Sequence, residues 1–228
     1  MNSEEKKVRH LAIILDGNRR YARKKGLLSW KGHSYGAENV NKVIDWCKEF
    51  GIKEVTFYAL STENLKREKK EVEELFNLFR EWFKKFKKED RVHKNKIKIR
   101  FIGDLFLVPE DIKKLALEIE KETENYNDYI INFCFAYGGR LELLHAFNKL
   151  KDKKREITEE DITKALWLSS EPDLVIRTGG MIRTSNFLPW QTIYSEWIFL
   201  DKLWPEFTKE DLISCLKDFE NRKRNFGK

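Results

Sequence analysis

Two hydrophobic patterns alternate along this chain. Short apolar runs that stop at polar residues or glycine are typical of buried strands, and apolar residues spaced every three or four positions are typical of amphipathic helices. The predicted strands span residues 8–15, 55–60, 97–102, 129–135, 173–176 and 193–199. The predicted helices span 36–50, 68–90, 109 to about 125, a segment after residue 140, a short segment from 158, and 208 to about 224.

This alternation predicts an α/β domain with a mostly parallel sheet of about six strands, flanked by helices on both faces. No linker rich in proline, glycine or serine interrupts the 228 residues, so we expect one domain over 1–228. Ligands in such folds bind outside the carboxyl ends of the strands. The polar residues that follow each predicted strand are therefore the candidates for chemistry.

Composition excludes several classes of protein. Apolar residues make up 41% of the chain and aromatic residues 13%, which excludes a disordered protein. No apolar run approaches the roughly 18 residues that span a bilayer, and residues 1–7 lack the apolar core of a secretory signal, so we expect a cytoplasmic protein. The three cysteines lie far apart, without metal or redox spacing, and are expected to be free thiols.

The net charge of +7 fits nucleic acid, anionic lipid or phosphorylated metabolites as partners. Most lysines alternate with glutamates on predicted helix faces, which is also the pattern of an ordinary solvated surface. Nucleic-acid binding would need exposed aromatic residues among Lys and Arg. Here the aromatic residues fall on faces predicted to be buried, so no nucleic-acid partner is expected.

The first predicted strand runs directly into Asp16, Gly17, Asn18, Arg19 and Arg20. A lone acid at this place suits a Mg²⁺ ion that also binds a diphosphate, because Mg²⁺ usually takes one or two carboxylates plus phosphate oxygens. The alternative is a helix N-cap, a position that Asp, Gly and Asn all suit. Arginines in the first turn oppose the helix dipole unless an anion binds there, which favours the phosphate site.

The fifth predicted strand runs into a second basic cluster. Arg177 is followed by Gly179 and Gly180, which allow a tight turn, and by Arg183 and Ser185. Two arginines can hold one diphosphate through paired hydrogen bonds. The alternative is a network of ion pairs, but no string of acids lies nearby in the sequence.

Three further sites carry both a functional and a structural interpretation. The segment from Ser61 to Arg67 follows the second strand and offers hydroxyls, an amide and a guanidinium, or a simple turn with a helix cap. Glu196 lies in an aromatic stretch, where a buried acid needs a partner or a metal, although it could be a surface residue. His33 is the one histidine near these motifs, and a lone histidine is often structural.

Six segments, in this order, resemble the cis-prenyltransferase family of the undecaprenyl diphosphate synthase type, and together they extend over nearly the whole chain. The matching segments are 10–20, 32–33, 58–64, 102–104, 137–140 and 173–196.

The resemblance implies a reaction in which an allylic diphosphate (farnesyl or geranylgeranyl) ionises and is attacked by isopentenyl diphosphate, with loss of a proton and formation of a cis double bond. Repeated condensation would give a long polyprenyl diphosphate, the precursor of a glycosyl carrier lipid. The resemblance also implies a non-Rossmann fold, Mg²⁺ as cofactor, a homodimer and possible peripheral contact with a membrane. A catalytically silent partner subunit of the same fold stays as an alternative.

The resemblance also implies roles for individual residues. Asp16 would be catalytic and would bind the metal together with Glu196, and His33, Ser61 and Asn64 would assist catalysis. The implied substrate-binding residues are Gly17, Asn18, Arg19, Arg20, Tyr21, His33, Ser61, Thr62, Glu63, Leu65, Arg67, Arg177, Arg183, Thr184 and Ser185.

A hydrophobic tunnel is expected beside the 68–90 helix. Ala59 leaves room at its wall, where family members that make short products carry a bulkier residue, so a long product is favoured. The expected tunnel residues are Phe57, Phe76, Phe79, Trp82, Phe83, Phe101, Ile131 and Phe133. Ser29, Leu65, Met181 and Asn225 depart from the usual family residues, and these departures bear on affinity and primer choice rather than on the reaction class.

Overall fold

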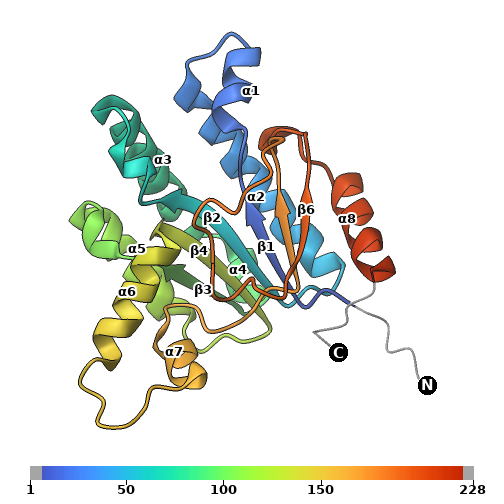
Figure 1. The fold of residues 1–228 in the computed structure, drawn as a ribbon. Helices are drawn as coiled ribbons and strands as arrows, with labels where there is room; N and C mark the ends of the chain where they lie inside the picture. Colours follow the sequence, from blue (N-terminus) through green and yellow to red (C-terminus); the bar gives the residue numbers. More distant parts are fainter. Residues whose placement is uncertain (1–6, 223–228) are drawn as a thin grey trace.

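Six parallel strands form one sheet in the order β3-β4-β2-β1-β5-β6 in the computed structural model, which describes residues 7–222 (Figure 1). The strands are β1 (His10–Ile14), β2 (Glu54–Ser61), β3 (Ile97–Ile102), β4 (Tyr129–Tyr137), β5 (Leu174–Arg177) and β6 (Glu196–Phe199). The predicted α/β architecture with about six strands is confirmed.

Helices connect the strands, as parallel pairing requires. They are α1 (Asn18–Lys24), α2 (Gly32–Glu49), α3 (Lys69–Lys87), α4 (Asp90–Lys94), α5 (Glu110–Thr123), α6 (Gly139–Leu150), α7 (Glu159–Ala165) and α8 (Lys209–Asn221). Helices α7 and α8 begin at capping boxes, with Thr158 and Asp161 in one and Thr208 and Asp211 in the other. The sequence predicted both threonine caps.

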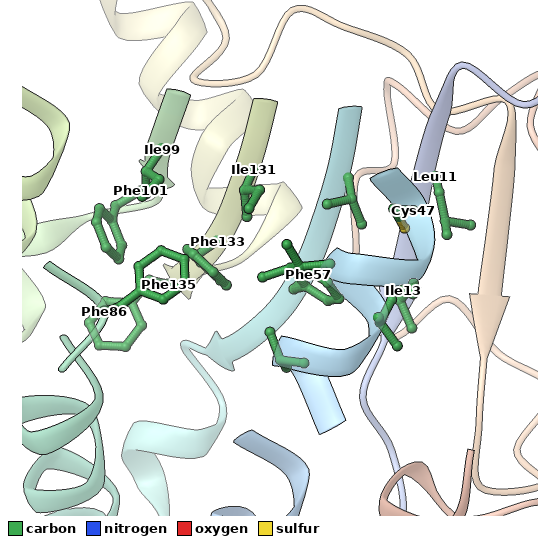
Figure 2. Close-up of a cluster of buried hydrophobic side chains, with 14 of the residues drawn as sticks. Leu11, Ile13, Cys47, Phe57, Phe86, Ile99, Phe101, Ile131, Phe133 and Phe135 are labelled. Atoms are coloured by element: carbon green, nitrogen blue, oxygen red, sulfur yellow. The ribbon is translucent and has the colours of Figure 1, made fainter. Parts of the chain in front are cut away.

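The main core lies between one face of the sheet and helices α2, α3, α5 and α8. Figure 2 shows aromatic side chains of β3 and β4 beside Phe86 of α3, with Phe57 of β2 on the far side of Phe133. Phe57 stacks on Phe133 with ring centroids 5.8 Å apart, and Phe79 meets Phe135 edge-on at 4.6 Å. Each large side chain buried in this way contributes about 1.5–3 kcal/mol, which identifies this layer as the main source of stability.

Strand β6 and helix α4 are among the elements that differ from the prediction. Strand β6 begins at Glu196 rather than at residue 193, because Thr192 and Ser195 close a turn through a backbone hydrogen bond of 3.2 Å. Helix α4 was not predicted, since its five residues bury a single apolar side chain, Val92, and are too short to show a helical period. Neither difference changes the topology.

The carboxyl ends of the strands form one edge of the sheet, called the rim below. Strand β1 lies at the centre, with β2 on one side and β5 on the other, and Ile14 pairs in register with Arg177. The chain leaves β1 toward α1 and returns to β5 from the opposite side of the sheet. Parallel sheets bind ligands in the crevice at such a switch point. Asp16 and Arg177 therefore lie where a ligand is expected.

Candidate functional site

Asp16 lies two residues beyond β1, and both of its carboxylate oxygens accept hydrogen bonds from arginines. Arg20 Nη2 donates to Oδ1 over 3.1 Å, and Arg177 Nη2 donates to Oδ2 over 2.9 Å. Asp16 does not cap α1, because Gly17 is the N-cap, with φ +113°, and no side chain bonds the first turn. The helix-cap interpretation therefore does not hold for Asp16, although it holds for Gly17, and the Asp16 carboxylate pairs with the arginines of the rim.

Arg177 ends β5 and is almost fully buried, with 4% of its surface exposed. Besides Asp16, it binds the 183–185 segment: Nη1 donates to Ser185 Oγ over 2.6 Å and to the carbonyl oxygen of Arg183. A buried charge needs such partners because its removal from water is costly. The Arg183 side chain is exposed and forms no ion pair among residues 7–222, so it is available to an anion. Thr184 beside it is exposed as well.

Gly179 allows the loop after β5 to approach closely the loop after β1. Its φ is +88°, and a Cβ atom there would lie 2.5 Å from Arg20 Nη2 and 3.1 Å from the carboxyl carbon of Asp16. Any larger residue would displace the Asp16–Arg20 ion pair. The glycine expected from the sequence to permit a tight turn therefore also makes room for a charged neighbour.

A polar pocket lies beside α1. Half of its eight lining residues are arginines, against one carboxylate. The lining consists of Asp16, Gly17, Asn18, Arg19, Arg20, Arg23, His33 and Arg67. Arginine guanidinium groups form paired hydrogen bonds with phosphate oxygens, so the pocket suits a diphosphate.

Glu71, on the first turn of α3, orders two of these arginines. Its Oε1 accepts a hydrogen bond from Arg67 Nη1 over 2.9 Å and lies 3.4 Å from Arg19 Nε. Glu71 is 5% exposed, so the carboxylate is held inside the protein by the two guanidinium groups. This pairing orients the side chains of Arg19 and Arg67. The side chains of Arg20 and Arg23 also line the pocket.

His33 and Asn18 lie where the polar pocket meets the apolar interior. Burial, together with the positive charges of Arg67 and Arg19, lowers the pKa of His33 to about 4. His33 Nε2 and Asn18 Oδ1 are buried without a hydrogen-bond partner among the described residues. Asn18 Nδ2 donates to the carbonyl oxygen of Leu15 over 3.0 Å. Unused polar atoms beside a basic pocket are typical of a binding site rather than of a core.

The loop after β2 is closed by its own polar side chains. The backbone N–H of Ser61 donates to Asn64 Oδ1 over 3.1 Å, and the N–H of Asn64 donates to Ser61 Oγ over 3.2 Å. Thr62 Oγ1 donates to Glu63 Oε2 over 3.3 Å. The polar side chains of this loop therefore order one another.

A second, apolar pocket lies between α2, α3 and the sheet. It shares Asn18 and His33 with the polar pocket, so the two adjoin. The apolar lining comprises Leu15, Ala37, Val40, Ala59, Leu75, Leu78, Phe79, Trp82, Phe83, Phe133, Phe135 and Trp204. Of the eight expected tunnel residues, four line this pocket, and the other four (Phe57, Phe76, Phe101 and Ile131) are buried in the core beside it.

Two predicted binding residues pack on neighbours. Leu65 is partly buried against the main core. Tyr21 lies on α1 with its ring 5.3 Å from that of Tyr35, and Lys25 Nζ lies 5.9 Å from the Tyr21 ring. Neither lines the two pockets described above. Asn225 lies outside the described residues.

The structure does not bring Glu196 to Asp16 within one chain, and this part of the prediction is wrong for the single subunit. Glu196 starts β6 and pairs in register with Leu174, so it lies at the edge of the sheet opposite the rim. The rim end of β6 is Phe199, three residues further on, or about 10 Å along the strand. Glu196 Oε2 instead accepts a hydrogen bond from Arg222 Nη1 over 3.0 Å.

Sequence reasoning missed three residues of the site. Arg23 lines the polar pocket and lies on the same face of α1 as Arg19 and Arg20, which its spacing could have indicated. Glu71, four residues after Arg67, carries the same signal. Asn186 joins two rim loops, and no sequence pattern marked it.

The acids of the site can hold Mg²⁺ only together with a diphosphate. No group of three or more His, Cys, Asp or Glu side chains within residues 7–222 converges on one point. Asp16 is a single carboxylate among arginines, so the chain offers no complete metal cage by itself. It fits an ion that arrives with a diphosphate, because Mg²⁺ takes few protein ligands and completes its shell with phosphate oxygens and water.

Comparison with known proteins gives consistent matches. Residues 14–227 match the family described as "Putative undecaprenyl diphosphate synthase". A tritrans,polycis-undecaprenyl-diphosphate synthase (geranylgeranyl-diphosphate specific) from Thermococcus kodakarensis is 43% identical over 96% of this chain and 87% of its own length. The protein of the same name from Pyrobaculum aerophilum is 42% identical, over 96% of this chain and 95% of its own length.

Two solved structures resemble this fold. Lavandulyl diphosphate synthase from Lavandula x intermedia, in complex with dimethylallyl diphosphate, superposes with a TM-score of 0.92 and 31% identity, covering 97% of this chain and 99% of that one. A probable undecaprenyl diphosphate synthase from Campylobacter jejuni has a TM-score of 0.84 and 33% identity, with full coverage of both chains.

Proposed function

Because the chain belongs to the undecaprenyl diphosphate synthase family and is an enzyme that transfers prenyl groups with cis double bonds, we propose that it condenses isopentenyl diphosphate repeatedly onto geranylgeranyl diphosphate. The product is a long polyprenyl diphosphate. The choice of primer is supported by relatives that are 41–43% identical and are named as specific for geranylgeranyl diphosphate.

One observation carries this proposal: the arginine-lined pocket and the apolar pocket adjoin at Asn18 and His33. An allylic diphosphate has a charged head joined to an apolar tail, and it matches the two pockets in that order. Each CH₂ group buried in the apolar pocket contributes about 0.8 kcal/mol, so the growing chain is retained between condensations.

Arg19, Arg20 and Arg67 hold the allylic diphosphate, and Arg23 adds a fourth charge to the same pocket. When the bond between the allylic carbon and the diphosphate oxygen breaks, negative charge builds up on the leaving diphosphate. Fixed guanidinium groups stabilise that charge, and loss of one such contact commonly costs about a hundred- to a thousand-fold in rate.

Isopentenyl diphosphate binds to the 183–185 segment. Arg183 and Ser185 contact its diphosphate, and the buried Arg177 holds both through the hydrogen bonds described above. The Ser61–Asn64 loop acts on the isopentenyl double bond, which attacks the allylic cation. Asn64 is a weak base, so its part in proton removal is to orient an acceptor such as a diphosphate oxygen.

Asp16 would hold Mg²⁺ together with a substrate diphosphate, and the ion would supply further charge stabilisation of the leaving group. Arg20 and Arg177 orient the Asp16 carboxylate for this role. Glu196 of the same chain lies too far from Asp16 to complete this site, for the reason given above.

The product serves as precursor of a glycosyl carrier lipid, and the enzyme acts as a homodimer. Exposed apolar side chains on α6 (Leu144 and Phe147) and on the 182–193 segment (Ile182 and Ile193) support an interface between copies. Among residues 7–222, no helix is long and apolar enough to cross a membrane. Contact with a bilayer would therefore be peripheral for this part of the chain.

The test is to incubate the purified protein with Mg²⁺, labelled isopentenyl diphosphate and either farnesyl or geranylgeranyl diphosphate. Mass spectrometry of the products gives chain length and primer preference, and sedimentation gives the oligomeric state. We expect long cis-polyprenyl diphosphates, formed faster from the geranylgeranyl primer. Absence of any labelled lipid product would favour a silent partner subunit, and retention on RNA with a steep salt dependence would favour nucleic-acid binding.

A further inference from the structure

Asn186 joins the two rim loops that carry the candidate isopentenyl-binding and proton-removal residues. Its Nδ2 donates to Glu63 Oε1 over 3.0 Å, in the loop after β2. Its Oδ1 accepts from the backbone N–H of Arg140 over 2.9 Å, in the first turn of α6. Its own carbonyl oxygen accepts from the N–H of Gly139 over 2.8 Å.

The local backbone explains why an asparagine suits this position. Ser185 and Asn186 both have positive φ, at +52° and +63°. This left-handed conformation costs most residues about 1–2 kcal/mol, and Asn tolerates it better than others do. An asparagine also offers a donor and an acceptor on one short side chain. Here the donor binds Glu63 and the acceptor binds Arg140.

The neighbouring contacts hold the same turn in place. Tyr58 Oη donates to the carbonyl oxygen of Ser185 over 3.4 Å, and the Tyr58 ring stacks on Phe187 at 4.7 Å. Arg177 Nη1 donates a hydrogen bond to Ser185 Oγ. Ser185 is thus fixed by its hydroxyl and its carbonyl, while Asn186 connects this turn to Glu63.

We propose that Asn186 is a positioning residue for the condensation step. It sets the distance between the 183–185 segment, which holds the isopentenyl diphosphate, and the Ser61–Asn64 loop, which acts on the isopentenyl double bond. The inference rests on the proposed function. The Asn186 side chain is not part of the lining of the allylic diphosphate pocket, which comes from Asp16, Gly17, α1, His33 and Arg67.

Three variants separate the contributions. Asn186→Gly keeps the left-handed backbone and removes both side-chain hydrogen bonds. Asn186→Asp keeps an acceptor for Arg140 but places a carboxylate against that of Glu63. The double variant Asn186→Asp with Glu63→Gln reverses donor and acceptor, because the new amide can donate to the new carboxylate.

In steady-state assays, we expect Asn186→Gly and Asn186→Asp to raise the KM for isopentenyl diphosphate about ten-fold and to lower kcat. The dissociation constant of the allylic diphosphate should stay unchanged. The double variant should recover most of the loss caused by Asn186→Asp. Asn127→Gly, at the opposite edge of the sheet, is the matched control and should behave as the wild type.

Amide hydrogen exchange gives a readout that needs no turnover: residues 61–64 should exchange faster in Asn186→Gly while α1 is unchanged. An active wild type together with an unaltered KM in Asn186→Gly, or no recovery in the double variant, would overturn the inference and leave the proposed function intact. Unchanged exchange in residues 61–64 would overturn it even if the wild type itself made no product.

Discussion

Replacement of Asp16 by alanine tests the centre of the site. The change removes the acceptor of two arginines, but Arg177 keeps its hydrogen bonds to Ser185 and to the carbonyl oxygen of Arg183. The Arg20 pair is 40% exposed on the arginine side and contributes little, whereas the bond to the buried Arg177 contributes about 1.5–3 kcal/mol. We therefore expect a loss of about 2–3 kcal/mol, and a folded protein whose Tm falls by roughly 5–10 °C.

Turnover should fall far more than stability. Asp16 is the one carboxylate among the described residues that line the polar pocket, so its loss removes their ligand for a diphosphate-bound Mg²⁺. It also leaves Arg20 and Arg177 without the carboxylate that orients them. Loss of a single electrostatic contact in a transition state costs about 10²–10³-fold, and here at least two contacts are affected. Binding of inorganic pyrophosphate without metal should persist, because the pocket keeps its four arginines.

Three measurements decide the outcome: product formation from labelled isopentenyl diphosphate, calorimetric binding of pyrophosphate in chelator, and thermal unfolding. Asp45→Asn is the matched control, since Asp45 also accepts from an arginine, Arg91 at 3.0 and 3.1 Å, but away from the rim. Turnover near the wild-type rate in Asp16→Ala would refute the role given to this carboxylate.

Three other changes address separate parts of the site. Ala59→Leu fills the wall of the apolar pocket, so mass spectrometry should show shorter products. Arg177→Lys cannot bind Asp16 and Ser185 together, so the KM for isopentenyl diphosphate should rise at least ten-fold, whereas a wild-type KM would contradict the assignment. The pKa of His33 is lowered to about 4 in the fold and is about 6.5 in the unfolded chain. Between pH 4 and 6.5 the unfolded chain therefore binds more protons than the folded protein. Stability should fall as pH drops from 6.5 to 4, by at most about 3 kcal/mol, and denaturant unfolding should show a smaller fall in His33→Asn.

The fold could be predicted well because buried parallel strands appear in a sequence as continuous apolar runs. Residues 129–135, for example, predict β4 with only its last two residues missed. Capping threonines fixed the starts of α7 and α8. Helix α4 gave no signal because one buried valine cannot define a period.

The site could be predicted in part. Parallel strands end at one edge, so Asp16 and Arg177 were placed together although 161 positions separate them. The sequence did not indicate that they bond to each other, because no local spacing relates them. Within one chain Glu196 does not reach Asp16, because a residue at the start of a parallel strand lies at the opposite edge from the residues that follow the strands.

Electrostatic costs explain why so few acids lie in this site. Helix α1 has no acidic residue in its first turn and carries Arg19 and Arg20 there, against the direction of its dipole. Glu71 neutralises part of this charge by binding Arg19 and Arg67, and Asp16 pairs with Arg20, which leaves Arg23 as the pocket arginine without an ion pair among residues 7–222. The unliganded fold bears this repulsion because the aromatic core supplies stability elsewhere. Binding of a diphosphate removes this repulsion, and the free energy released contributes to the affinity. Arginines that were all paired with carboxylates would lack this contribution.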